Sequence, residues 1–375
     1  MSNQAPTIRW VTAPAWATCL LLVFGCSTAC DGDAALARLG TEDAGATQVF
    51  IPPPTVDAGV EDALEDAGSA EPKLGPPWPV ILVHGFSGFN SLGPLDYFFR
   101  VLDTLADQGE TQVYAPAIPP YNSVEDRAPF LALAIDDVLA RTNAAKVHLI
   151  AHSQGGLDAR YVISVLGYDD RVATLTTVAT PHRGTPLADY VLDLPENSLD
   201  PVAVVLAWLI GALDSPDAQA GGGDDNPGWR NDMDASALSL ASVTRETYNH
   251  QHPDAPGVPI FSVAAVSNLR RANSICDQGE WGPLRRVDSM EPLLVATAAV
   301  LSGWNPFDPI PNDGVVPTGS MVWGEFLGCV PADHFDEVGQ IADLLPHLLS
   351  GFDHLALYRD LVGRIRSWED RHVQP

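Results

Sequence analysis

The chain has 375 residues, of which 46% are hydrophobic, and its formal net charge at pH 7 is −28. This length and apolar content are enough to bury one large core or two modest ones. So acidic a protein would repel the phosphates of nucleic acid, which excludes DNA or RNA as a partner.

The first thirty residues predict an export signal. Arg9 precedes the mostly apolar run WATCLLLVFGC, which is too short to cross a membrane but suits a secretory signal peptide. The end of this run resembles a bacterial lipobox, in which Cys26 would carry a lipid. Two outcomes stay open: an outer-membrane lipoprotein anchored through Cys26, or ordinary cleavage near Ala29 and release from the cell. A buried hydrophobic helix is the less favoured interpretation of residues 1–30.

Residues 31–76 predict a disordered segment. They contain ten acidic residues against two basic ones, set among alanine, glycine and proline. Such a composition cannot bury enough apolar surface to fold by itself. We interpret the segment as a linker that holds the following domain away from a membrane, or as a disordered leader. The folded domain is expected to span residues 77–375.

From residue 77 onwards, strand and helix patterns alternate. Strands are expected at 80–83, 111–117, 146–150 and 172–180, and helices at 94–109, 125–143 and 155–167. Alternation of this kind indicates a parallel sheet with right-handed crossovers. Functional residues in such a sheet lie at the carboxyl ends of the strands, where Gly85 and Ser153 both fall.

The segment at about 193–235 breaks this alternation. It holds an apolar helix candidate, DPVAVVLAWLIGALD, followed by the polar and glycine-rich AQAGGGDDNPGW. An ordinary packed helix is one interpretation. The favoured one is a lid that covers an apolar cleft and opens on a lipid surface.

The motif AHSQG places Ser153 between a strand and a helix. It matches the G-x-S-x-G nucleophile elbow, with Ala151 in place of the first glycine. The strained turn projects the hydroxyl, which needs a base and an oxyanion hole to act as a nucleophile. The expected oxyanion donors are the backbone N–H groups of Gln154 and of Phe86, in VHGFSG. His84 is predicted to make structural hydrogen bonds.

The acid and the base are expected to follow the serine in that order. PIPNDGVVP places Asp313 on a tight turn, and PADHFDEVGQ places His334 on another. His152 adjoins the serine, but side chains of neighbouring residues on a sharp turn diverge. We therefore predict Asp313 and His334 as the partners of Ser153.

Only two cysteines, Cys276 and Cys329, fall in the expected folded domain, because Cys19, Cys26 and Cys30 belong to the export segment. In an oxidising compartment such a pair is most simply a disulfide. A metal site would need more ligands, and a catalytic thiol would need its own base.

Five segments together resemble the bacterial true lipases of the Pseudomonas and Burkholderia type, within the α/β-hydrolase superfamily. They are PVILVHGFSG, HLIAHSQGGLDARYV, VATLTTVATPHRGTPLADY, NDGVVP and DHFDEVGQ. The resemblance weakens through the lid and around residues 255–310. It implies an α/β fold with a mostly parallel central sheet, helices on both faces and a helical lid. It also implies Ser153 as nucleophile, His334 as base and Asp313 as the acid that orients it, with Phe86 and Gln154 at the oxyanion hole.

The same resemblance implies a structural calcium ion near the histidine. Asp336 matches one carboxylate ligand, and the carbonyls of Gln340 and Leu344 match two more. Asp288 is the candidate for the second carboxylate, with Glu291 as its rival, and oxygen ligands of this kind suit calcium. The disulfide of the family ties the region before the catalytic loops to the histidine loop, although Cys329 lies nearer the histidine than its counterpart in the family.

The function expected from these features is a secreted serine carboxylic-ester hydrolase, with a triacylglycerol lipase favoured. The alternatives are an esterase or polyester hydrolase without interfacial activation and, more remotely, a non-catalytic lipid-binding surface protein. A monomer that meets its lipid or ester substrate at an oil–water interface is expected, with no cofactor for catalysis. Some relatives need a dedicated membrane-bound folding chaperone, and the sequence leaves that requirement open.

Overall fold

The computed structural model describes residues 73–86, 91–92, 95–195, 232–267, 275–284, 288–303, 310–340 and 352–373. The expected export segment, most of the expected linker and nearly all of the expected lid lie outside these residues. Among the described helices, none is both long enough and apolar enough to cross a membrane.

The centre of the fold is a six-stranded sheet in which all neighbouring strands are parallel, in the order β4-β1-β5-β6-β7-β8. Its strands are β1 (Val80–Val83), β4 (Val113–Tyr114), β5 (Val147–His152), β6 (Val172–Val178), β7 (Ile260–Ala265) and β8 (Glu325–Val330). In the middle of the sheet, Leu149 pairs with Ile81 of β1 and with Leu175 of β6. A separate two-stranded ribbon joins β2 (Ser91–Leu92) to β3 (Leu95–Asp96). The predicted α/β class with a parallel sheet is confirmed.

The strands are apolar throughout because helices cover both faces of the sheet. Along β1, Val80 and Leu82 pack into one core cluster, and Ile81 and Val83 pack into the other. This alternation follows from the two-residue period of a strand.

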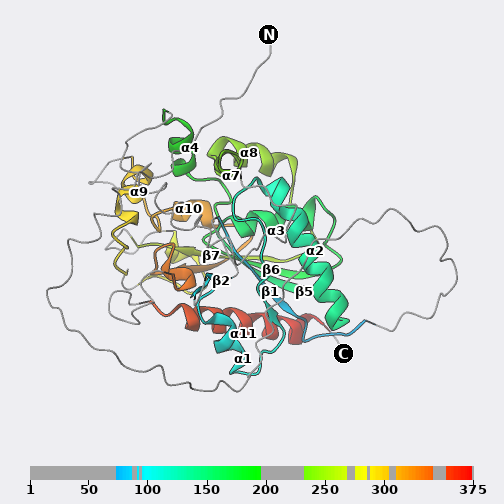
Figure 1. The fold of residues 1–375 in the computed structure, drawn as a ribbon. Helices are drawn as coiled ribbons and strands as arrows, with labels where there is room; N and C mark the ends of the chain where they lie inside the picture. The colour runs from blue at the N-terminus through cyan, green and yellow to red at the C-terminus, as the bar shows by residue number, and fades with distance from the viewer. Residues whose placement is uncertain are drawn as a thin grey trace, which may run out of the picture.

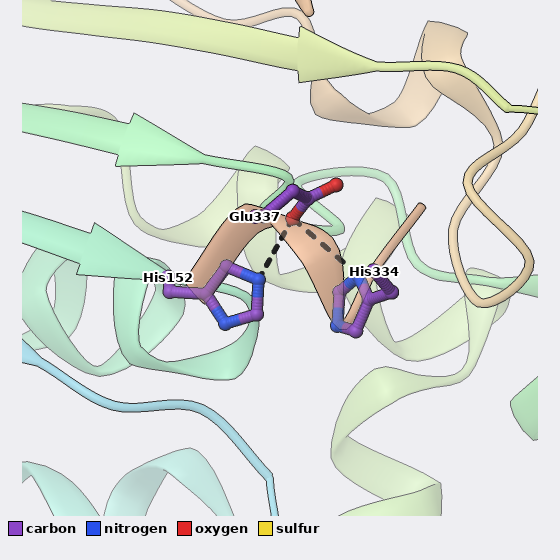
Figure 2. A group of neighbouring side chains, drawn as sticks. All are labelled: His152, His334 and Glu337. Atoms are coloured by element: carbon purple, nitrogen blue, oxygen red, sulfur yellow. Dashed lines mark hydrogen bonds and ion pairs between the residues drawn. The ribbon is translucent and has the colours of Figure 1, made fainter. Parts of the chain in front are cut away.

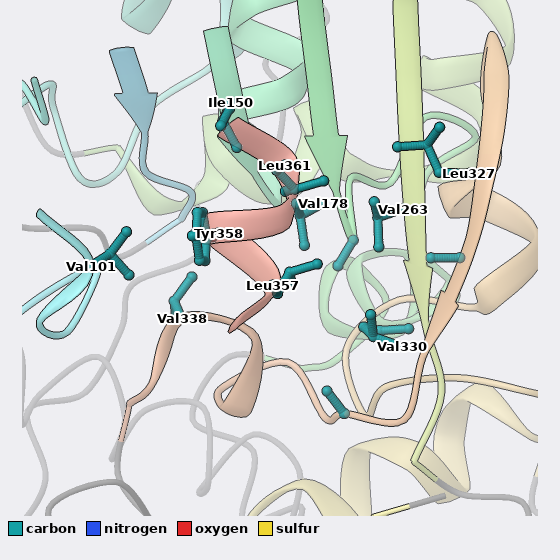
Figure 3. Packing of buried hydrophobic residues seen from close by; sticks show 14 of the residues in the cluster. Val101, Ile150, Val178, Val263, Leu327, Val330, Val338, Leu357, Tyr358 and Leu361 are labelled. Carbon is teal, nitrogen blue, oxygen red and sulfur yellow. The ribbon is translucent and has the colours of Figure 1, made fainter. Parts of the chain in front are cut away.

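The helices α1 (Val101–Ala106) and α11 (His354–His372) lie on one side of the sheet, and α2 (Val124–Thr142) and α3 (Gln154–Ser164) on the other (Figure 1). Figure 3 shows Leu357, Tyr358 and Leu361 of α11 facing the strands that carry Val178 and Val263. The remaining described helices are α4 (Pro186–Leu192), α7 (Met233–Leu240), α8 (Ser242–Gln251), α9 (Leu294–Leu301), α10 (Thr318–Met321), and the short 3-10 turns η3 (Cys276–Gln278) and η4 (Asp336–Val338).

Two expected elements are shorter than the sequence pattern indicated. The helix expected at 94–109 forms only over Val101–Ala106, because Leu95 and Asp96 form a strand and Arg100 has a left-handed backbone with φ of 57°. The strand expected at 111–117 is reduced to Val113–Tyr114 at the sheet edge. Pro116, just beyond it, has no N–H with which to extend the ladder.

The predicted disulfide is present. Cys276 in η3 and Cys329 in β8 are both buried and are bonded with a Cα–Cα distance of 5.2 Å and a sequence separation of 53. The bond ties η3 to the strand that leads into the predicted histidine turn.

Replacing Cys276 and Cys329 together by alanine is expected to lower the free energy of unfolding by about 4 kcal/mol, the chain-entropy cost of releasing a loop of this length. Urea unfolding of the wild type with and without reductant, and of the double variant, measures the loss. The double variant should be as stable as the reduced wild type and insensitive to reductant. Equal stability of the oxidised wild type and the double variant would contradict a stabilising role.

Candidate active site

Ser153 occupies a strained turn between β5, which ends at His152, and α3, which begins at Gln154. Its φ of 54° and ψ of −130° lie in a region that residues other than glycine rarely adopt. The turn needs small neighbours: a Cβ on Gly155 would lie 2.6 Å from the carbonyl oxygen of His84. This geometry matches the elbow that the sequence motif predicts.

The predicted nucleophile, base and acid lie in contact. The Nε2 atom of His334 is 3.0 Å from Ser153 Oγ, and its Nδ1 atom is 2.6 Å from Asp313 Oδ2. Asp313 is fully buried, and its other oxygen accepts the N–H groups of Val315 (2.8 Å) and Val316 (2.7 Å). Since the carboxylate accepts at Nδ1, that nitrogen carries the proton, and Nε2 is left to accept the serine hydroxyl.

The sheet brings these residues together although they are far apart along the chain. Ser153 follows β5, and His334 follows β8 on the turn that leads into η4. The segment holding Asp313 is anchored at the end of β7, because the Thr318 hydroxyl donates to the carbonyl of Ala265. All three side chains therefore lie at the carboxyl edge of the sheet, as the topology predicts.

The two predicted oxyanion donors flank the serine. A Cβ on Gly85 would lie 2.6 Å from Ser153 Cβ, so the backbone that leads into Phe86 passes close to Ser153. Gln154 is the first residue of α3, and the first N–H groups of a helix have no acceptor within the helix. The Phe86 ring packs edge-on against Tyr121, with the ring centroids 5.2 Å apart.

His84 is a buried neutral histidine. Burial, together with the charge of Arg127, lowers the pKa of His84 to about 3. The N–H of Ile118 donates to its Nε2 atom at 3.1 Å, so its Nδ1–H donates to the carbonyl of Gly85 at 3.0 Å. This contact agrees with the structural role predicted from the sequence.

His152 packs against the ring of His334. Its ring centroid is 4.7 Å from that of His334. Its Nδ1 lies 2.7 Å from the Tyr97 hydroxyl, which also accepts the N–H of Gly85, and its Nε2 lies 2.8 Å from Glu337 Oε2. Figure 2 shows both imidazoles facing Glu337, whose carboxylate is 3.8 Å from His334 Nδ1.

Burial shifts the pKa of each of these two supporting groups in the direction that favours its uncharged form. Burial, and then the negative charges of Asp313 and Asp333, raise the pKa of Glu337 well above its ordinary value. Burial, and then the charge of His334, lower the pKa of His152 well below its ordinary value. The ligand atoms of His152, His334 and Glu337 lie within 4.8 Å of one another. Because hydrogen bonds already engage these atoms, we assign the group to support of the His334 ring.

The described residues among the expected calcium ligands lie on two adjoining segments. Asp336 is buried in η4, beside the histidine, and Asp288 is half-buried on the other segment. The N–H of Glu291 donates to Asp333 Oδ2 at 2.7 Å, and this bond joins the two segments. The side chain of Gln340 donates to the carbonyl of Tyr97, and Leu344 lies outside the described residues.

Sequence reasoning missed several buried polar residues around this site. Tyr97, Arg127 and Asp333 carry no motif of their own, although Asp333 directly precedes the predicted histidine. Burial raises the pKa of Asp333 to about 6, partly offset by three backbone N–H donors. The one available signal for Arg127 was a charge on the apolar face of the helix expected at 125–143.

A parallel sheet with a strained serine turn and a Ser–His–Asp contact at its carboxyl edge defines the class of protein: an α/β-hydrolase. The sequence is 31% identical over 293 residues to a triacylglycerol lipase of Vibrio cholerae, covering 77% of this chain and 88% of that protein. It is 32% identical over 323 residues to a triacylglycerol lipase of Burkholderia plantarii, covering 77% and 86%. The chain belongs to the family of bacterial triacylglycerol lipases, which are carboxylic-ester hydrolases.

Two further comparisons agree with this fold. The solved structure of Staphylococcus hyicus lipase superposes with a TM-score of 0.53 at 17% identity, covering 82% of this chain and 100% of that one. A family model described as palmitoyl protein thioesterase matches residues 79–206. That match includes Ser153 but ends before Asp313 and His334.

Proposed function

We propose that the chain is a serine hydrolase that releases fatty acids from acylglycerols through an acyl-enzyme. The observation that carries this proposal is the double contact of the His334 imidazole, 3.0 Å from Ser153 Oγ and 2.6 Å from Asp313 Oδ2. The contact supplies a base for the hydroxyl and a partner for the imidazolium that forms.

The reaction proceeds in two halves. Ser153 Oγ attacks the ester carbonyl while its proton passes to His334 Nε2, and the carbonyl π electrons move to oxygen. The tetrahedral intermediate collapses, the C–O bond to the alcohol breaks, and the alcohol takes the proton from His334. Water then attacks the acyl-enzyme in the same way, releases the fatty acid and regenerates Ser153.

The backbone N–H groups of Phe86 and Gln154 stabilise the oxyanion in both halves. Each such donor is commonly worth about 3 kcal/mol of barrier. Asp313 keeps the Nδ1–H tautomer of His334 in place and offsets the charge that the imidazole gains. The fully buried Asp313 acts here by its charge and orientation.

Exposed apolar side chains favour a lipase over an esterase for soluble substrates. Leu238, Val243 and Val295 are 56%, 73% and 56% exposed. They lie on α7, α8 and α9, which all pack against α4. Apolar surface on these neighbouring helices suits contact with an emulsified lipid.

Emulsions of tributyrin, trioctanoin and triolein test this assignment. We expect hydrolysis of all three. The rate of tributyrin hydrolysis should rise when its concentration exceeds the solubility limit, because the enzyme is proposed to act on acylglycerol at the surface of emulsion droplets. Ser153→Ala, assayed in parallel, controls for contaminating lipase. Hydrolysis of dissolved tributyrin with no release of oleate from triolein would instead identify an esterase.

We propose that a calcium ion lies beside the histidine turn, held by the carboxylates of Asp288 and Asp336 and the carbonyls of Gln340 and Leu344. The oxygen-rich donor set and the adjoining segments support it. The ion would stabilise the loop that carries His334.

A chelator is expected to lower the melting temperature of the protein, and added Ca²⁺ should restore it. Asp288→Asn should be less stable than the wild type in calcium and insensitive to the chelator. A melting temperature unchanged by the chelator would contradict the site.

We also propose that the chain is exported, because its disulfide suits an oxidising compartment. Labelling of cells with a palmitate analogue distinguishes the two modes of export. Loss of label in Cys26→Ser would indicate a lipoprotein, and unlabelled protein in the medium would indicate release.

A further inference from the structure

Arg127, on α2, is fully buried, and its guanidinium makes five hydrogen bonds. Its Nε donates to Asp158 Oδ2 at 2.9 Å. Its Nη1 donates to the carbonyls of Pro119 (2.7 Å) and Pro120 (3.0 Å). Its Nη2 donates to the carbonyls of His84 (3.1 Å) and Gly85 (3.3 Å). A guanidinium has five N–H donors, so the contacts use its full capacity.

One of the five acceptors, the carbonyl of Gly85, belongs to the peptide that leads into Phe86, and the carbonyl of His84 belongs to the peptide before it. The carbonyl of Gly85 accepts from Arg127 and from the Nδ1–H of His84. In a trans peptide the carbonyl and the following N–H point in opposite directions. Fixing this carbonyl towards Arg127 therefore turns the N–H of Phe86 to the other side, away from Arg127.

The Nε atom of the same guanidinium contacts the helix that follows Ser153. Asp158 is fully buried on α3, the helix that begins at Gln154. Burial raises the pKa of Asp158 to about 6, although the charge of Arg127 opposes that rise. A single planar group thus links the backbone before Phe86 to the helix that carries the N–H of Gln154.

We propose that Arg127 is the positioning residue of the oxyanion hole: it sets the direction and the separation of the Phe86 and Gln154 N–H groups. The inference rests on the proposed function of the Ser153 site. Arg127 contacts neither substrate nor reacting atoms in this account, so its loss should lower kcat and leave KM nearly unchanged. Misplacing such donors is expected to lower kcat about a hundredfold.

A purely structural arginine would behave differently, and the chain offers a matched control. Arg366, on α11, also makes five hydrogen bonds, to both oxygens of Glu110, to Glu369 and to the carbonyl of Trp78. Trp78 precedes β1, whereas Gly85 follows it. Arg366 therefore binds the backbone just before β1, and Arg127 binds the backbone just after it.

The test compares Arg127→Lys and Arg127→Met with Arg366→Met. Kinetics with p-nitrophenyl butyrate give kcat and KM, and urea unfolding gives stability. Affinity for a trifluoromethyl ketone, which forms a tetrahedral oxyanion on a serine, reports on the hole directly. Both Arg127 variants should lose kcat and ketone affinity by the same factor, with KM within about threefold. Arg366→Met should lose stability and keep its kcat.

Arg127→Lys retains the charge without the planar fork, so it keeps the experiment decisive should Arg127→Met fail to fold. Asp158→Asn, which keeps an acceptor of the same shape, adds a third folded variant and should also lower kcat. Wild-type kcat in Arg127→Lys, or an equal loss of kcat in Arg366→Met, would overturn the inference. A wild-type chain with no turnover and no ketone binding would instead contradict the proposed function.

Discussion

Replacing Ser153 by alanine is expected to lower kcat for ester hydrolysis by about a millionfold while leaving the fold intact. The hydroxyl lies 3.0 Å from His334 Nε2 and is the nucleophile of the proposed reaction. Removing one oxygen leaves the buried apolar packing around the turn unchanged. Because alanine has the same Cβ, the positive φ of 54° costs the variant about as much as it costs the wild type.

Turnover of p-nitrophenyl butyrate measures the loss, and circular dichroism together with urea unfolding checks the fold. The variant should unfold at nearly the urea concentration of the wild type. Undiminished turnover by a purified, folded Ser153→Ala protein would remove Ser153 from the mechanism.

Replacing Asp313 by asparagine is expected to lower kcat by about ten-thousandfold. The backbone N–H groups of Val315 and Val316 both donate to Oδ1 of Asp313, so the asparagine oxygen must occupy that position. Its NH₂ group then faces His334 Nδ1 and forces that nitrogen to accept. The proton moves to Nε2, and the imidazole no longer accepts the proton of Ser153.

Glu337→Gln is the matched comparison for this variant. Glu337 is a second buried acid near the imidazole, 3.8 Å from His334 Nδ1, and burial with neighbouring charges raises its pKa, which favours the protonated form that a neutral amide resembles. We expect its kcat to fall far less than that of Asp313→Asn. A larger loss in Glu337→Gln than in Asp313→Asn would assign the orienting role to Glu337. The pH dependence of kcat, measured for both variants, reports on the imidazole directly.

The chemistry at the site was predictable because it depends on short local signals. The elbow needs small residues two positions before and two positions after Ser153, and the motif AHSQG has Ala151 and Gly155 there. Asp313 and His334 each lie on a turn marked by the local sequence, and the expected chain order of serine, acid and base was enough to choose them. The disulfide followed from the two cysteines left in the domain.

The supporting residues could not be predicted because their contacts exist only in the folded chain. Arg127 and Asp158 are separated by 31 residues, and Tyr97 and His152 by 55. The position of Arg127 on the apolar face of its helix suggests burial, but nothing in the local sequence identifies the acceptors that its guanidinium meets. The helix expected at 94–109 failed for a related reason, since the left-handed backbone at Arg100 depends on surroundings that the periodic pattern does not contain.

Labelling with a fluorophosphonate, followed by intact-mass and peptide mass spectrometry, tests the central claim most directly. Such a probe bonds covalently to a serine that an adjacent base has activated, which a protein that merely binds lipid would not provide. We predict one adduct per chain, located on Ser153, with labelling abolished in Ser153→Ala and strongly slowed in Asp313→Asn. A single adduct on another residue, or ester turnover with no adduct at all, would contradict the account.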